Sequence, residues 1–172
     1  KQKLLRITDI HNRKVSWSKV PFTTVDKEMA TLKSVLDGDI LFARIGATVG
    51  KTYLAQGVPG NAVYASYLIR VRTVLVCPDY LISFLDSPFY WEQITENAVG
   101  SGRPNVNGSK LANLLVPVPP LAEQRRIVAE LDRLLALVDG IERDSADLDA
   151  LKARARSKVL DLAARGLLVP QD

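Results

Sequence analysis

The sequence predicts a mixed α/β globular region followed by one long α-helix that forms a coiled coil. Through residues 1–120, short runs of β-branched and aromatic residues alternate with glycine and proline breaks. From residue 121 to 166 there is no proline, and apolar residues recur at alternating spacings of four and three. The charge also differs, with 14 Lys/Arg against 9 Asp/Glu in the first region and 9 against 10 in residues 121–172. We therefore predict two domains, 1–120 and 121–172.

The first region combines predicted strands with predicted helices. Pro78 and Ser87-Pro88 should each begin a helix, because proline favours the first helical position and apolar residues follow at helical spacing. Asp37-Gly38 marks a turn before a strand. The predicted strands are Leu4–Ile10, Asp39–Ile45, Lys51–Ala55 and Ala62–Arg72.

The second region carries the repeat of a coiled coil over about five heptads. A helix of 46 residues, at about 1.5 Å per residue, is a rod of roughly 70 Å. Gly166 should end it, and Gly140 is a weak point at which it could bend. So long an apolar seam requires a partner helix in this protein or in another chain; the alternative is packing against its own domain. The seam residues are Ile127, Leu131, Leu134, Val138, Ile141, Leu148, Val159 and Leu162.

Composition argues against several classes of protein. No apolar run reaches 18 residues and no signal peptide is visible, so neither a membrane span nor secretion is predicted. One cysteine, Cys77, excludes an internal disulfide and fits a reducing cytoplasm. The chain has only one histidine, His11, in addition to that single cysteine. These numbers argue against a zinc site and against most nucleophile–base–acid sets of catalytic residues. We predict no metal, no cofactor and no catalytic residue.

The run Gly46 to Thr52 imitates a nucleotide-binding phosphate loop. Such a loop places four residues between its first glycine and Gly-Lys-Thr, whereas only residues 47–49 separate Gly46 from Gly50. It must also open a helix, but residues 53–60 have no helical stripe. We therefore expect a β-hairpin whose turn runs from Gly46 to Gly50, with Lys51 exposed at its rim.

Taken in order, three groups of motifs resemble a target recognition domain and conserved helix from the specificity subunit of type I restriction–modification systems. The resemblance covers nearly the whole chain, and its junction and C-terminal motifs are the most specific. The motifs are Asp37–Gly46 with Gly50-Lys51, then Leu85–Tyr90 with Gly100 and Asn105-Val106, and finally Val116–Val128 with Gly166–Asp172.

The resemblance implies a non-catalytic subunit that recognises DNA. Two conserved helices would pair antiparallel and separate two recognition domains, each reading half of a split double-stranded DNA target. The subunit would direct methyltransferase subunits and restriction/translocase subunits. Family members usually carry two such units and an earlier opening segment, so we expect either a fragment or a half-subunit that forms an antiparallel homodimer.

Candidate DNA contacts lie in the basic first region. The loop from Gly100 to Lys110 is the preferred candidate, because Arg and Asn side chains can pair with guanine and adenine edges. The alternatives are that the asparagines only cap turns, and that Arg70 and Arg72, on one face of a strand, pair with acids. Tyr64, Tyr67 and Trp17 are assigned to core or rim. The candidates are Arg13, Lys14, Arg44, Thr48, Lys51, Arg70, Arg72, Ser101, Arg103, Asn105, Asn107 and Lys110.

Two other functions remain open on the sequence alone. The chain could be a nucleotide-binding enzyme of the phosphate-loop type, which would be stabilised by ATP. It could also be a structural coiled-coil adaptor whose globular head binds protein, which would show no salt-dependent binding to DNA.

Overall fold

A computed structural model describes residues 1–11, 13–98 and 105–164. The chain forms two compact units, Lys1–Val128 and Ala129–Asp172. No helix within the described ranges is both long and apolar enough to cross a membrane.

Two three-stranded sheets and a small hairpin make up the β-structure of the first unit. In one sheet β1 (Gln2–Leu5) lies between β4 (Phe22–Thr23), antiparallel, and β7 (Ala62–Tyr64), parallel. In the other, β5 (Ile40–Ala43) lies between β6 (Thr52–Leu54) and β8 (Leu68–Val71), both antiparallel. The small hairpin pairs β2 (Ile10–His11) with β3 (Lys14–Val15).

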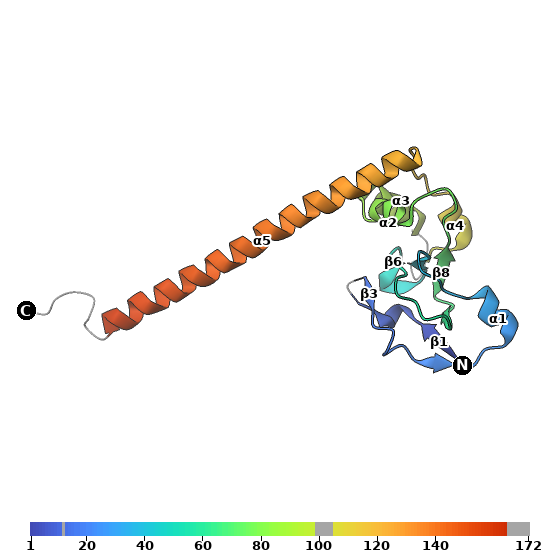
Figure 1. Cartoon of the computed structure of the whole chain (residues 1–172), viewed down its shortest axis with the longest axis horizontal. Coiled ribbons are helices and arrows are strands. Elements are labelled where there is room, and N and C mark those ends of the chain that lie inside the picture. The colour runs from blue at the N-terminus through green and yellow to red at the C-terminus, as the bar shows by residue number, and fades with distance from the viewer. Residues whose placement is uncertain (12, 99–104, 165–172) are drawn as a thin grey trace, which may run out of the picture. The chain divides into compact units, whose positions relative to one another are not determined.

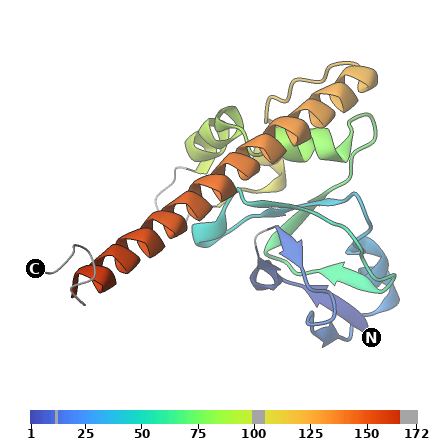
Figure 2. The same cartoon turned by 60° about the vertical axis from the view of Figure 1, so that its left-hand side comes forward.

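Helices cover one face of the β6-β5-β8 sheet, and the β1 sheet lies beyond its other face (Figures 1 and 2). Proline begins both α2 and α3, as the sequence predicts. The helical elements of this unit are the 3₁₀ turns η1 (Ile7–Asp9) and η2 (Gly46–Thr48), and the helices α1 (Lys27–Leu32), α2 (Pro78–Phe84), α3 (Pro88–Ala98) and α4 (Gly108–Ala112).

Strand β5 is buried at all four residues because both of its faces meet a hydrophobic core. Leu41 points into the core shared with the β1 sheet, beside Leu5 and Leu68. Phe42, on the opposite face, joins the core formed with α2 and α3, together with residues such as Ile94. A strand covered on both sides reads as a continuous apolar run, which explains the Ile-Leu-Phe-Ala sequence.

Two predicted strands are each divided in the structure. The stretch Leu4–Ile10 becomes β1, η1 and β2, and Ala62–Arg72 becomes β7 and β8 in different sheets. A turn closed by the Leu68 N–H donating to the Ala65 carbonyl separates β7 from β8. An apolar, β-branched run has the propensity for strand throughout, and only packing on two sheets decides where the chain turns.

The junction motif anchors the start of α5 (Leu121–Ala164) within the first unit. The Gln124 side chain is buried; its amide donates to the Pro119 carbonyl at 2.8 Å and its carbonyl oxygen accepts from the Cys77 N–H at 2.8 Å. The Tyr80 hydroxyl donates to the Pro117 carbonyl at 2.9 Å. One glutamine therefore joins the proline-rich segment, the start of α2 and the first turn of α5.

In the second unit α5 continues as an unbroken helix through Gly140 to Ala164, without a bend assigned there. Its apolar side chains lie open to solvent, and among the predicted seam residues Ile141 is 69% exposed. Side chains at Val159 and Leu162 lie outside the described residues, as does Gly166. Pairing of this helix stays a prediction. The other exposed apolar residues in this part are Leu131, Leu134, Leu135, Leu137, Val138, Leu148 and Leu151.

Candidate nucleic-acid interface

The connection between β5 and β6 is the expected hairpin. Gly46 and Gly50 have φ of 78° and 81°, in the left-handed region that glycine reaches at little cost. Lys51 is exposed beside the turn. Beyond Gly50 the chain enters strand β6, antiparallel to β5, and not a helix. The turn therefore lacks the helix N-terminus that a phosphate loop needs, and the nucleotide-binding alternative is wrong.

This hairpin end is joined to the segment after residue 104. Ile45 forms an isolated antiparallel bridge with Asn105, and the Val106 N–H donates to the Arg44 carbonyl at 2.9 Å. Chain segments some 60 residues apart thus lie side by side. The pairing brings half of the predicted contacts to one end of the β6-β5-β8 sheet: Arg44, Thr48, Lys51, Asn105, Asn107 and Lys110.

The electrostatics of this end are one-sided. The segments that meet at this end, residues 43–52, 65–69 and 105–113, contain three Lys/Arg (Arg44, Lys51 and Lys110) and no Asp or Glu. Asn105 and Lys51 are exposed. Arg44 is half-buried, and its buried Nε has no hydrogen-bond partner among the described residues. A surface of cations and amides without carboxylates suits a polyanion.

Asn107 has a structural role at this end, which was one of the two alternatives. It caps α4, its side-chain oxygen accepting from the Lys110 N–H at 2.9 Å. The helix therefore begins inside the stretch predicted to be a loop up to Lys110. Lys110 Nζ donates to the Asn105 carbonyl at 3.2 Å, and the Thr48 hydroxyl donates to the Ile45 carbonyl at 3.4 Å.

Helix α3 packs against the Gly46–Gly50 turn and holds it in place. The buried Tyr90 hydroxyl donates to the Gly50 carbonyl at 2.6 Å, and burial raises the pKa of that phenol. A Cβ on Gly50 would stand 2.7 Å from Ile94 and 3.0 Å from Trp91. Glycine at this position therefore satisfies both the backbone conformation and the close approach of α3.

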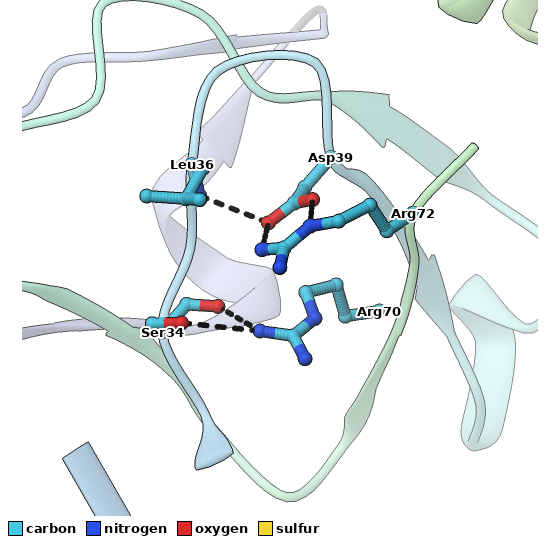
Figure 3. Close-up of polar contacts among 5 residues, drawn as sticks. All are labelled: Ser34, Leu36, Asp39, Arg70 and Arg72. Carbon is cyan, nitrogen blue, oxygen red and sulfur yellow. Dashed lines mark hydrogen bonds and ion pairs between the residues drawn. The ribbon is translucent and has the colours of Figure 1, made fainter. Parts of the chain in front are cut away.

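The side chains of Arg70 and Arg72 bind other residues of the same unit (Figure 3). Arg72 forms a two-pronged ion pair with the buried carboxylate of Asp39, while Arg70 donates to the carbonyl and hydroxyl of Ser34. The sequence alternative of pairing with an acid thus holds for Arg72. Arg70 also lies over the Tyr64 ring, 5.6 Å from its centroid.

The remaining candidates are placed elsewhere or fall outside the description. Arg13 has φ of 60° and is ion-paired with Asp86, while Lys14 is exposed in β3. Ser101 and Arg103 lie outside the described residues. Within the described ranges, no group of three or more metal-ligating side chains is found.

A family model described as "Type I restriction modification DNA specificity domain" matches residues 8–148. The chain belongs to this family. Among the curated type I specificity subunits, that of EcoKI from Escherichia coli K12 is 29% identical over 98% of this chain and 38% of its own length. The StySPI specificity subunit of Salmonella potsdam is 27% identical over 96% of this chain and 36% of its own length. The chain therefore spans less than two fifths of these relatives.

Solved structures of the type I family share the fold. The HsdS subunit from Thermoanaerobacter tengcongensis matches with a TM-score of 0.63 and 23% identity, over 94% of this chain and 40% of that one. A chain from a study of type I complex assembly and conformational transition matches with a TM-score of 0.65 and 22% identity, over 99% of this chain and 43% of that one. The mixed α/β region with a long C-terminal helix is thus a type I specificity fold.

Two contacts at this end could not be predicted from the sequence. Tyr90 was not singled out, because no local pattern shows that its hydroxyl reaches Gly50, 40 positions away. Tyr67, assigned to core or rim, is exposed, and its carbonyl accepts the Arg44 N–H at 3.1 Å. That contact depends on how β8 pairs with β5, which no local spacing records.

Proposed function

We propose that this chain is the DNA-recognition unit of a type I restriction–modification specificity subunit, reading one half of a bipartite double-stranded target. The observation that carries the proposal is the Ile45–Asn105 bridge in a chain of this family. It unites the glycine turn and the segment after residue 104 into one acid-free, cationic end. Cations there would contact phosphates, and exposed amides such as Asn105 would reach base edges.

The same proposal gives the chain no catalysis of its own. It would direct modification (methyltransferase) and restriction/translocase subunits to the target. The absence of an acid/base or nucleophile constellation in the sequence supports this reading, as does the family to which the chain belongs.

We assign the exposed stripe of α5 to pairing with a second such helix, antiparallel, in a homodimer when only one unit is present. The exposure of Leu134, Val138 and Ile141 supports a missing partner. The distribution of charge along α5 supports antiparallel pairing. Residues 121–147 hold four Lys/Arg against seven Asp/Glu, and residues 148–164 hold four against two. Antiparallel helices place the acidic half of one beside the basic half of the other, whereas parallel helices place like charges together.

The test is binding of the 172-residue chain to duplexes that it selects from a randomised pool, measured by fluorescence anisotropy across a salt series. Lys51→Ala and Arg103→Ala are expected to weaken binding by about 1–3 kcal/mol if the side chain contacts a base. A phosphate contact would instead weaken all duplexes alike and reduce the salt slope by about one.

Lys19→Ala is the matched control, because Lys19 is an exposed lysine outside the cationic end. It should leave affinity unchanged. Normal binding by both Lys51→Ala and Arg103→Ala would refute the site assignment. Failure of the wild-type chain to bind any selected duplex, with and without a type I methyltransferase subunit present, would refute DNA recognition itself.

A further inference from the structure

Tyr67 stands out among the aromatic residues by its exposure and its neighbours. Its side chain is 59% exposed, more than any other aromatic side chain in the described part of the chain. Tyr67 is the last residue of the turn before β8, next to Leu68, which lies opposite Ala43 in the β5–β8 ladder. Its carbonyl accepts the Arg44 N–H at 3.1 Å, so the backbones of Tyr67 and Arg44 are adjacent. The exposed tyrosine side chain therefore belongs to the same end of the sheet as Arg44.

Three other tyrosine and tryptophan side chains in this unit contact the protein itself. Tyr90 is buried and bonded to Gly50, and the Trp17 Nε1–H donates to the Gln56 carbonyl at 3.0 Å. Tyr64 is half-buried, with Arg70 over its ring. The Tyr67 hydroxyl, by contrast, makes no hydrogen bond to another described residue, and among these residues its ring makes no aromatic or cation–π contact.

The surroundings decide which partner this ring suits. On its other side Arg44 is bonded to Val106, so Tyr67, Arg44 and the Ile45–Asn105 bridge form one continuous row across the sheet end. The segments that build the row carry no carboxylate. A cationic, acid-free setting suits a phosphodiester chain, and an aromatic ring set in it can lie against deoxyribose or a base.

We propose that Tyr67 is a further DNA-contacting residue, whose ring packs against the sugar and base surface of the half-site next to the phosphates held by the cationic row. This inference rests on the proposed DNA recognition. A ring contact differs physically from a cation contact, because it releases no counterions and its contribution to affinity does not depend on salt. That difference makes it separable from the effects of Lys51.

The experiment measures the affinity of the full chain for wild-type-selected duplexes at several salt concentrations. Tyr67→Ala should raise Kd by about 5- to 150-fold, the range for a lost aromatic contact to a nucleotide, with the slope of log Kd against log salt unchanged. Tyr67→Phe should keep most of the affinity, and Tyr67→Leu should fall between the two. Lys51→Ala should reduce the slope instead if Lys51 contacts a phosphate.

A second readout locates the ring directly. Duplexes carrying 5-iodouracil in place of thymine should photocrosslink to the tryptic peptide of residues 52–70, and Tyr67→Ala should remove that crosslink. Phe22→Ala is the matched control, since Phe22 is a comparably exposed aromatic residue (57%) in the β1 sheet and should change neither readout.

The outcomes separate the two proposals. If the wild-type chain binds DNA and Tyr67→Ala, folded to the same unfolding midpoint, binds equally well, the tyrosine contact is refuted while DNA recognition stands. A loss of affinity accompanied by a reduced salt slope would also overturn it, since the ring would then only be holding Arg44 in place. If the wild-type chain binds no DNA, with and without a type I methyltransferase subunit present, both proposals fall together.

Discussion

Arg72 holds the buried carboxylate of Asp39 with two nitrogens, Nε at 2.7 Å from one oxygen and Nη2 at 2.9 Å from the other. The Leu36 N–H donates to the same carboxylate at 2.9 Å (Figure 3). Burial by itself would raise the pKa of Asp39, but the hydrogen bonds from Arg72 and Leu36 and the charges of Arg72 and Arg70 outweigh it and lower the pKa. The second Asp of the Asp-Gly-Asp motif thus fastens the end of β8 to the turn before β5.

Asp39→Asn should lower the free energy of unfolding by about 1–3 kcal/mol, the cost of leaving a hydrogen-bonded charge partner unsatisfied. Chemical denaturation at neutral pH measures it. The control is Glu130→Gln, because the Glu130–Arg133 pair has nearly the same distances, 2.9 and 2.7 Å, on an exposed helix surface. An exposed pair contributes about 0–1 kcal/mol, so an equal loss in both variants would contradict the argument from burial.

The Asp39–Arg72 ion pair also predicts that the stability of the fold depends on pH in the acidic range. Because the pKa of Asp39 is lower in the folded chain than in the unfolded chain, its contribution to stability is complete above the ordinary carboxyl pKa of about 3.9. It is lost as pH falls from there through the folded pKa. Denaturation curves recorded from neutral to acidic pH should therefore converge for wild type and Asp39→Asn at the acidic end; a constant gap would show that the charge is not responsible.

Gly50 should tolerate alanine less well than Gly46, although both have positive φ in the same turn. At Gly46 a Cβ meets nothing within 4 Å, so Gly46→Ala should cost only the left-handed backbone, about 1–2 kcal/mol. Gly50→Ala adds overlap with Ile94 and Trp91, for about 1–3 kcal/mol more. Thermal unfolding of the two variants measures the difference. Equal midpoints would mean that α3 yields freely and does not fix the turn.

Gln124→Ala should destabilise the first unit by about 1–3 kcal/mol, because the Cys77 N–H and the Pro119 carbonyl lose their shared buried partner. The segment 113–120 should then be cut faster by protease, which limited proteolysis with mass spectrometry would detect. Arg125→Ala changes the exposed neighbour on the same turn and should have little effect. Unchanged cleavage in Gln124→Ala would show that Tyr80 alone suffices to hold the segment.

Substituting Leu134 and Ile141 together by lysine should dissociate a dimer of the chain, because two charges would enter the seam of the paired helices. Light scattering at several concentrations should give a mass near twice 18.9 kDa for wild type and near 18.9 kDa for the variant. Ala136→Lys is the control, since residue 136 lies opposite the seam in the predicted heptads and is exposed. A monomeric wild type at every concentration would contradict pairing by the chain alone, and binding to a methyltransferase subunit would be tested next.

The local features of the chain were determined by the sequence alone. Proline starts and apolar spacing place α2, α3 and the long helix, since these depend on residues three or four positions apart. Gly46 and Gly50 identify the hairpin turn because the backbone there must reach positive φ. The order of the motifs also identifies the family, which the family model then shows.

Only the tertiary structure decided which distant segments meet. Strand propensity runs unbroken from Ala62 to Arg72, but packing against two different sheets divides it at residues 65–67. Asp39 forms an ion pair with Arg72, and the Tyr90 hydroxyl donates to the Gly50 carbonyl. Ile45 forms a β-bridge with Asn105. Each of these pairs is more than 30 residues apart in the sequence. Local spacing carries no record of such pairings, because they depend on how whole elements are covered and which buried polar groups remain to be satisfied. The cationic and amide residues of this end could therefore be predicted from the sequence. That they come together from separate segments could not.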